Sequence, residues 1–347
     1  MTIKGRGASW NPQNRFESLS YVVDEDAHVD DESPLPRTVF LRDPTRSIIA
    51  RNDSPDVGFD ASVNPYRGCE HGCIYCFARP SHEYLGFSAG LDFETKILVK
   101  EDAPELLREE LMSPKWQPQV LMMSGVTDPF QPIERKLEIT RRCLGVLAEF
   151  RNPTAIITKN HLVTRDVDHL GELAQFDAAS VSISITSLDS KLARIMEPRT
   201  STPEMRLAAV ETLAKAGVPV NVMCAPIIPA INDHEMPKIL EAARDAGARA
   251  AGFVVLRLPW AVAPLFEQWL EEHFPDRKDK VLNRIRDLRN GKLYDSTWGK
   301  RGRGEGIFAE QFRAIFDVTC RKLGLNERRY ELSAEHFRRP TAQGSLF

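Results

Sequence analysis

Between residues 93 and 258 the sequence alternates between short apolar runs and longer stretches with helical periodicity, and this alternation limits the fold most strongly. The apolar runs predict strands at Phe93–Lys100, Val120–Ser124, Ala155–Thr158, Ser180–Thr186, Val218–Ala225 and Gly252–Leu258. The stretches between them predict helices at Pro104–Met112, Glu134–Phe150, Val167–Gln175, Pro203–Ala216 and His234–Ala246. Strands that alternate with helices form a parallel sheet. In an open sheet or a barrel of this kind, functional residues gather at the carboxyl ends of the strands.

Three cysteines lie close together ahead of most of this pattern, at Cys69, Cys73 and Cys76. Their C-x3-C-x2-C spacing supplies three thiolates without a nearby fourth. A structural zinc site and an ordinary ferredoxin cluster both use four ligands. Three clustered thiolates suit a [4Fe–4S] cluster that keeps one iron open, with a zinc-bound or unligated group as the alternative. Gly68 and Gly72 would let the backbone turn tightly around the cluster, because glycine accepts a positive φ.

The motif C-x3-C-x-aromatic-C resembles the signature of the radical S-adenosylmethionine (SAM) enzymes. Segments Asn64–Cys69, Cys76–Pro80, Thr127–Pro132 and Ile157–Asn160 resemble a narrower group, the spore photoproduct lyase-like or DNA repair photolyase-like proteins. The resemblance covers about residues 55 to 260. It implies a partial (β/α)6 barrel of the TIM type with a helical C-terminal extension. It also implies a [4Fe–4S] cluster, SAM, a 5′-deoxyadenosyl radical and a flavodoxin-like electron donor.

The same resemblance assigns cofactor contacts to residues at the ends of the predicted strands. In that superfamily the second strand is followed by groups that hold the amino group of SAM, and a lysine after the third faces its carboxylate. The implied contacts are Tyr75, Ser124, Thr127, Asp128, Lys159, Ser184 and Arg199. Each has a structural alternative: Asp128 could cap a helix, Lys159 could extend from a strand end into solvent, and Arg199 could pair with Glu197.

The hydrogen donor is where the sequence departs from spore photoproduct lyase. That enzyme uses a cysteine on the strand that corresponds to Val120–Thr127, and the matching position here is Met122 or Gly125. Cys224, near the end of the fifth predicted strand, is the candidate substitute. Packing of Cys224 as a small apolar side chain is the alternative.

Charge is distributed unevenly although the net charge is only −3. Residues 1–54 are expected to form a mobile acidic segment, because an acidic run with Pro and Ser buries little surface. After the core at 55–260, residues 261–335 predict helices at Pro264–His273, Lys280–Asn290 and Ile307–Leu323. A basic, glycine-rich loop lies within this extension. Its Lys300, Arg301 and Arg303 could contact nucleic-acid phosphates, or they could simply be solvated.

The last segment, residues 336–347, ends Gln343-Gly-Ser-Leu346-Phe347. This ending resembles the peptide by which bacterial replication and repair proteins bind the sliding clamp, and packing on the same chain is the alternative. No apolar run approaches the about 18 residues of a membrane span. Six cysteines, three of them clustered, fit a reducing compartment and predict a cytoplasmic protein.

Three functions therefore remain open. The first is a radical SAM enzyme that acts on nucleic acid, for example in DNA repair. The second is a radical SAM enzyme that modifies a peptide or small metabolite. The third is a non-catalytic iron–sulfur sensor that binds DNA.

Overall fold

A seven-stranded sheet forms the centre of the computed structural model, which describes residues 3–17, 36–328 and 330–340. The strand order is β10-β9-β8-β7-β6-β3-β2, and all neighbours are parallel except β2 and β3. The strands are β2 (Ile49–Arg51), β3 (Ala61–Val63), β6 (Leu121–Met123), β7 (Thr154–Thr158), β8 (Ala179–Ser184), β9 (Val220–Ile227) and β10 (Ala250–Val255). Six parallel strands in chain order confirm the predicted partial (β/α)6 barrel.

The first strand of this barrel is β3, which the sequence analysis missed. The run Phe93–Lys100 was predicted to be a barrel strand, and this was wrong. Its first residues form the short helix α1 (Asp92–Thr95), and β5 (Lys96–Val99) joins a separate small sheet. That sheet has the order β1-β5-β4, with β1 (Val39–Arg42) and β4 (Tyr66–Arg67).

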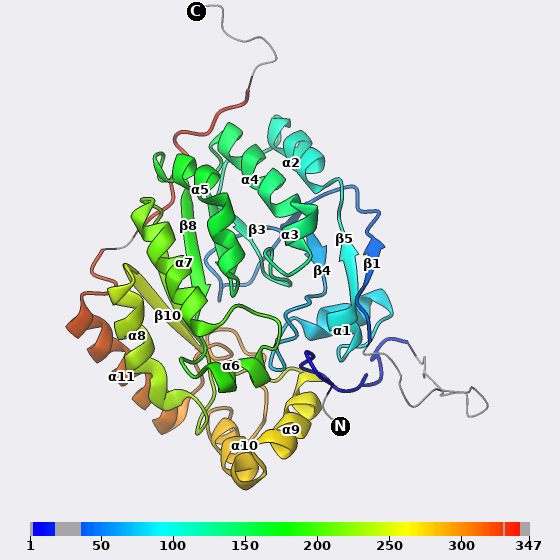
Figure 1. The fold of residues 1–347 in the computed structure, drawn as a ribbon, viewed down its shortest axis with the longest axis vertical. Coiled ribbons are helices and arrows are strands. Elements are labelled where there is room, and N and C mark those ends of the chain that lie inside the picture. Colours follow the sequence, from blue (N-terminus) through cyan, green and yellow to red (C-terminus); the bar gives the residue numbers. More distant parts are fainter. Residues whose placement is uncertain (1–2, 18–35, 329, 341–347) are drawn as a thin grey trace, which may run out of the picture.

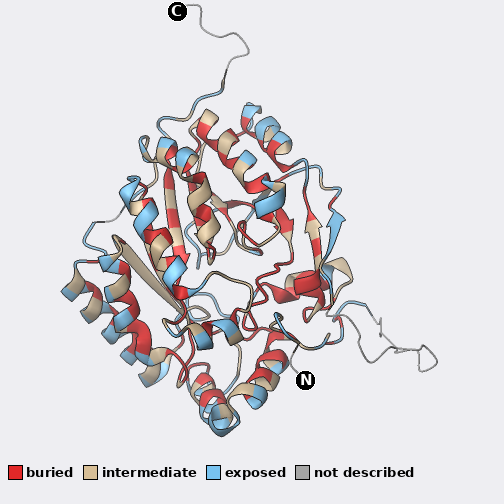
Figure 2. Ribbon diagram, in the orientation of Figure 1, coloured by how far each residue is buried: buried red, intermediate tan, exposed pale blue. Residues whose placement is uncertain are grey.

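Helices cover the outer face of the parallel sheet, with their buried sides toward it (Figures 1 and 2). They are α2 (Ala103–Met112), α3 (Glu134–Leu137), α4 (Ile139–Phe150), α5 (Val167–Ala174), α7 (Pro203–Lys215) and α8 (Met236–Asp245). Helix α6 (Ser190–Met196) lies instead at the strand ends, where its Met196 packs in a separate apolar cluster with Ile74. The predicted single helix 134–150 is broken at Glu138, which has a φ of 53°. The break lets the Glu134 carboxylate accept hydrogen bonds from the backbone N–H groups of Thr140 and Arg141, at the start of α4.

The three helices of the C-terminal extension are present and occupy two different places. Helix α11 (Gly306–Leu323) packs on α8, and its Phe316 lies 4.9 Å from the ring of Phe253 in β10. Helices α9 (Val262–His273) and α10 (Lys278–Asp287) lie beyond the strand ends, at the lower edge of Figure 1. Their apolar side chains form a second core with residues of the cysteine loop, among them Cys73 and Tyr75. The extension therefore shapes the end of the barrel where the chemistry is expected.

The basic loop between α10 and α11 joins the two edges of the barrel. The backbone N–H of Val255, at the end of β10, donates to the carbonyl of Gly302 (2.9 Å). On the other side, Arg301 forms an ion pair with Asp56, in the connection between β2 and β3. The backbone N–H of Gly299 also donates to Asp56. This bridge, residues 297–304, spans the side on which the sheet does not close on itself.

Ordered structure also occurs within residues 1–54, where we expected a mobile segment. Strand β2 pairs with β3, and Ala8 is buried in the second core. The backbone N–H groups of Gly7 and Ala8 donate to the buried carboxylate of Glu94 (3.0 and 2.8 Å). The acidic run at 24–32 lies outside the described residues.

Candidate active site

The cysteine loop runs from Gly68 to Cys76, directly after the first barrel strand. Gly68 and Gly72 have φ values of 80° and 65°, as the sequence predicted. A Cβ on Gly68 would lie 2.9 Å from His82, and a Cβ on Gly72 would lie 2.6 Å from Glu94. Glycine is therefore required at both positions by conformation and by space.

A buried arginine, Arg79, holds the backbone of this loop in place. Its guanidinium donates to the carbonyls of Cys73 (3.0 Å) and Gly72 (3.3 Å), and it pairs with Glu94. The backbone N–H of Cys69 donates to the Phe93 carbonyl (2.9 Å) and that of Ile74 to the Met196 carbonyl (3.0 Å). The loop is thus fixed from both sides before any ligand binds.

The three thiols fit the demands of an iron–sulfur cluster. Cys69 and Cys73 are buried and Cys76 is half-buried, and none forms a disulfide. Burial, with Asp128 and the other two cysteines close by, raises the pKa of Cys69 well above its usual range. Bound iron would offset this mutual repulsion of thiolates. The part of the chain that the structure describes contains no three His, Cys, Asp or Glu side chains placed to hold one metal ion. A [4Fe–4S] cluster does not require three ligands around one ion, because each thiolate binds a different iron.

Thr127 was predicted to contact SAM, and the structure gives its hydroxyl another partner. Its Oγ1 donates to the carbonyl of Gly68 (2.6 Å), and Gln131 Nε2 donates to Thr127 Oγ1 (3.2 Å). Gln131 Oε1 in turn accepts from the backbone N–H of Glu70 (2.9 Å). The segment Thr127–Pro132 therefore braces the cysteine loop.

Asp128 has a similar bracing role and is surrounded by donors. It accepts from the backbone N–H groups of Lys159 (2.8 Å) and Phe130 (2.9 Å) and from the Thr158 hydroxyl (2.7 Å). His71, which lies between the cysteines, places its Nδ1 3.3 Å from the same carboxylate. Burial alone would raise the pKa of Asp128, but His71 and these hydrogen bonds hold it below its usual range. Sequence reasoning missed His71, although its position inside the motif was a signal.

Lys159 remains the predicted contact for the SAM carboxylate. It follows β7, at the carboxyl end of the strand, and its ammonium lies 5.9 Å from the ring centre of Tyr75. Among the described residues no carboxylate forms an ion pair with this ammonium. The side chain is only half-buried, so a cation is available beside the cysteine loop.

Tyr75 is tied to a buried polar network that the sequence did not reveal. Its hydroxyl donates to Glu197, which also pairs with Arg206 and accepts from the Thr186 hydroxyl (2.6 Å). Burial raises the pKa of Glu197, and the neighbouring Arg206 opposes that shift. Arg206 Nη1 further donates to the Ser184 carbonyl (3.0 Å). The network therefore joins the aromatic residue of the motif to the end of β8.

The remaining predicted cofactor residues have different surroundings. Ser124 has a φ of 132°, an unusual value for a residue other than glycine, and it directly follows β6. Ser184 is buried, and it shares a face of β8 with Ser182 because Val181 and Ile183 pack in the helix-covered core. Arg199 pairs with Glu70 at 3.1 Å and lies against Thr38, so its guanidinium is engaged on the outside of the cysteine loop.

Cys224 packs in the helix-covered core, which favours the alternative that it is a small apolar side chain over a role as hydrogen donor. It is fully buried in the core that includes Val222 and Cys320. Burial and the nearby Cys320 raise its pKa far above the usual range. Since side chains alternate along a strand, the interior face of β9 carries Asn221 and Met223 instead.

The predicted nucleic-acid contacts are only partly available. Lys300 pairs with Glu305 (2.8 Å) and Arg301 with Asp56, whereas Arg303 is exposed and forms no ion pair with the described residues. The predicted clamp-binding residues Gln343, Leu346 and Phe347 lie outside the described residues. No helix in the described part of the chain is long and apolar enough to cross a membrane.

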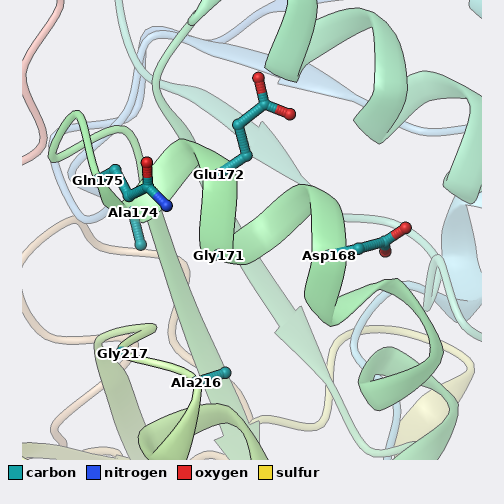
Figure 3. Close-up of a pocket in the computed structure, with 7 residues that line it drawn as sticks. All are labelled: Asp168, Gly171, Glu172, Ala174, Gln175, Ala216 and Gly217. Atoms are coloured by element: carbon teal, nitrogen blue, oxygen red, sulfur yellow. The ribbon is translucent and has the colours of Figure 1, made fainter.

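A surface pocket that contains none of the candidate site residues is drawn in Figure 3. It lies between α5 and the turn after α7, at the amino ends of β8 and β9, and its lining includes Asp168, Glu172 and Gly217. Chemistry in parallel barrels occurs at the opposite, carboxyl ends. We therefore assign the candidate active site to the cysteine loop and the strand ends around it.

Comparison with known proteins places this geometry in a family. Residues 63–243 match the Radical SAM superfamily. An uncharacterised protein of Mycobacterium tuberculosis is 36% identical over 232 residues, which is 66% of this chain and 67% of that protein. An uncharacterised protein of Methanocaldococcus jannaschii is 28% identical over 222 residues, which is 64% of this chain and 79% of that protein.

Among solved structures, spore photoproduct lyase complexed with dinucleoside spore photoproduct is similar, with a TM-score of 0.58 and 17% identity. The match covers 82% of this chain and 80% of the lyase chain, and it shows a shared fold. A mutant of that lyase with bound AdoMet matches equally well, with a TM-score of 0.58. The family match and the cysteine loop agree: the chain belongs to the Radical SAM superfamily, whose enzymes use a [4Fe–4S] cluster and SAM.

Proposed function

We propose that this radical SAM enzyme acts on nucleic acid, in a reaction of the DNA-repair kind. The observation that carries the proposal is a cation at the mouth of the barrel, Arg257, which follows β10. Its guanidinium lies 4.2 Å from the ring centre of Phe77, the residue after Cys76. No carboxylate of the described residues forms an ion pair with Arg257. The nearby Asp56 also acts on Arg257 electrostatically, but its ion pair is with Arg301. A half-buried cation that forms no ion pair of its own favours an anionic substrate, and phosphate is the anion of nucleic acids.

The similarity to spore photoproduct lyase adds support at the level of the fold. In that enzyme a dinucleoside photoproduct has been captured in the same kind of barrel. Here the match extends over most of the chain and includes parts outside the family-matched residues. The terminal hydrogen transfer must differ, because Met122 or Gly125 replaces the donor cysteine and Cys224 faces the helices.

Separate residues of this chain would hold the cluster, SAM and the substrate. Cys69, Cys73 and Cys76 would hold the cluster, and Lys159 would pair with the carboxylate of SAM. When bound, the cluster and SAM supply a 5′-deoxyadenosyl radical that can remove a hydrogen atom from the substrate. The apolar side chains of α9 and α10 shield Cys73 and Tyr75 from water. Arg257 would attract a phosphate to the open side of the site.

The test is SAM cleavage under oxygen-free conditions. The reconstituted protein is given SAM and dithionite, and 5′-deoxyadenosine is measured without nucleic acid, with duplex DNA and with single-stranded DNA. Product that rises with DNA supports the proposal, whereas product indifferent to DNA favours a peptide or metabolite. The Cys73→Ala variant is the control, because it lacks one cluster ligand and should form no product in any mixture.

We further propose three features of the enzyme's cellular setting. A flavodoxin-like protein would deliver the electron, and a cytoplasmic location would keep the clustered thiols reduced. The Gln343–Phe347 ending would bind the sliding clamp. Removing residues 341–347 tests the last point: clamp binding should disappear while SAM cleavage stays at the level of the full chain.

A further inference from the structure

A set of exposed and half-buried aromatic and arginine side chains extends from the cysteine loop across the surface. We define this aromatic–arginine surface by its seven members: Phe16, Phe77, Tyr84, Trp260, Tyr294, Arg15 and Arg257. They come from five separate segments of the chain. For this reason no single stretch of the sequence contains them all.

The side chains follow one another at stacking distances. Phe16 and Tyr84 stack with ring centres 4.7 Å apart, and the Arg15 guanidinium lies 5.0 Å from the Phe16 ring. The same guanidinium lies 4.2 Å from the ring of Trp260.

From Trp260 the surface continues toward the cysteines. The ring of Trp260 is 5.8 Å from that of Tyr294. Tyr294 is near enough to Arg257 for the two groups to interact electrostatically, and the Arg257 guanidinium lies 4.2 Å from the ring centre of Phe77. Rings and cations therefore alternate up to the residue beside Cys76.

Exposure of these rings is unusual for such large side chains. Trp260 is 54% exposed, Phe16 55%, Tyr84 73% and Phe77 50%. Trp260 also has a φ of 45°, which is strained for a residue other than glycine. A strained backbone that holds a tryptophan in solvent does not serve packing, and such strain gathers at binding and catalytic sites.

Charge determines which ligand fits this surface. Arg15 is paired with Glu83 at 2.7 Å. Arg257 forms no ion pair with the described residues, because the nearby Asp56 is paired with Arg301. The exposed Arg303 belongs to the nearby bridge. Burial and the nearby Arg301 lower the pKa of Arg257. A bound anion would therefore stabilise its charged form. Aromatic faces alternating with cations are the pattern that binds unstacked bases together with their phosphates.

We propose that the aromatic–arginine surface binds a single-stranded or flipped-out stretch of nucleic acid and leads it to the cysteine loop. This inference rests on the proposed function and specifies the form of its substrate. In a duplex the base faces are covered by their neighbours, so a target base must leave the stack before it can lie on these rings.

The experiment measures binding by the full-length, cluster-loaded protein. Fluorescence anisotropy follows a labelled 12-nucleotide single strand, an abasic strand of equal length and a duplex of equal length, each at two salt concentrations. We expect the ordinary single strand to bind at least about tenfold more tightly than the abasic strand, since one stacked base contributes about 5- to 100-fold. Equal binding of the ordinary and abasic strands would overturn the stacking role.

Variants locate the contact. Trp260→Leu and Tyr84→Leu should each weaken single-strand binding about 5- to 100-fold. Two variants are used so that the test still holds if one of them fails to fold. Tyr330→Leu is the matched control, because Tyr330 is an exposed aromatic that contacts Asp177, away from this surface. It should bind like the wild type.

Three results would overturn the inference, and they separate it from the proposed function. If DNA stimulates 5′-deoxyadenosine formation but both leucine variants bind single strands normally, the surface is not the binding site and the function stands. If the variants instead slow electron delivery from a flavodoxin while strand binding is unchanged, the surface docks a protein. If the wild type binds no nucleic acid, the function itself fails.

Discussion

Replacement of Gly72 by alanine tests the geometry of the cysteine loop quantitatively. Two effects should add. An alanine at φ 65° carries a left-handed penalty of about 1–2 kcal/mol. Part of this is offset, by about 0.4–1 kcal/mol, because alanine has less freedom in the unfolded chain.

The second effect is steric. The new Cβ would lie 2.6 Å from Glu94 Oε2, and ordinary contact begins at 3.4 Å, so the carboxylate must retreat by about 0.8 Å. Glu94 is fully buried and holds Gly7, Ala8 and Arg79. Loss of one such charged hydrogen bond costs about 1.5–3 kcal/mol. The free energy of unfolding should therefore fall by about 1.5–4.5 kcal/mol in total.

Gly217→Ala is the matched control, because Gly217 has a φ of 79° and nothing within 4 Å of the new Cβ. It should lose only about 1 kcal/mol. Urea unfolding of the cluster-free proteins and iron per chain after reconstitution measure both effects. Equal urea midpoints for the two variants, or full iron content and wild-type stability in Gly72→Ala, would refute the reasoning.

Three further predictions concern the site and its support. Lys159→Met should raise the Kd for SAM about 10- to 100-fold with iron content unchanged, because a charge-assisted contact is lost; titration of the loaded protein measures it, and an unchanged Kd would remove Lys159 from the site. Burial lowers the pKa of His82 to about 4 from its usual 6.5, so the unfolded chain takes up the proton first and stability falls as the pH drops from 6.5 toward 4. The free energy of unfolding should lose about 3 kcal/mol over that range through this residue, and His82→Gln should lose that much less; parallel pH curves for both proteins would contradict this. Cys224→Ala should leave the conversion of the nucleic-acid substrate unchanged and cost about 1 kcal/mol of stability. If the variant still cleaved SAM but no longer converted the substrate, Cys224 would be the hydrogen donor.

Much of the barrel was predictable because its longer strands are apolar runs with one buried face. Strands β7 to β9 and helices α5, α7 and α11 lie close to their predicted ranges. Strand β3 was not predictable, since three residues carry no detectable period. Residues Phe93–Lys100 were misassigned because an apolar run gives no information on which sheet it joins.

The site divides in the same way. The three cysteines and Lys159 follow from local motifs, so sequence was sufficient for them. Thr127 and Asp128 were identified as important, but their partners Gly68, Gln131 and His71 depend on how the loop folds back. The aromatic–arginine surface depends on tertiary contacts throughout, and no window of sequence contains it.

The bridge between β10 and the β2–β3 connection joins two surface segments whose lengths can change during evolution. Its contacts are a backbone hydrogen bond at Gly302 and the contacts of Arg301 and Gly299 with Asp56. None of them involves the interior face of a barrel strand. A change in the length of residues 52–60 or 297–304 would therefore change how the two edges of the sheet are held together, while the cysteine loop stayed intact. Lineages that share this loop could thus come to differ in how the open side of the barrel is held, through two surface segments alone.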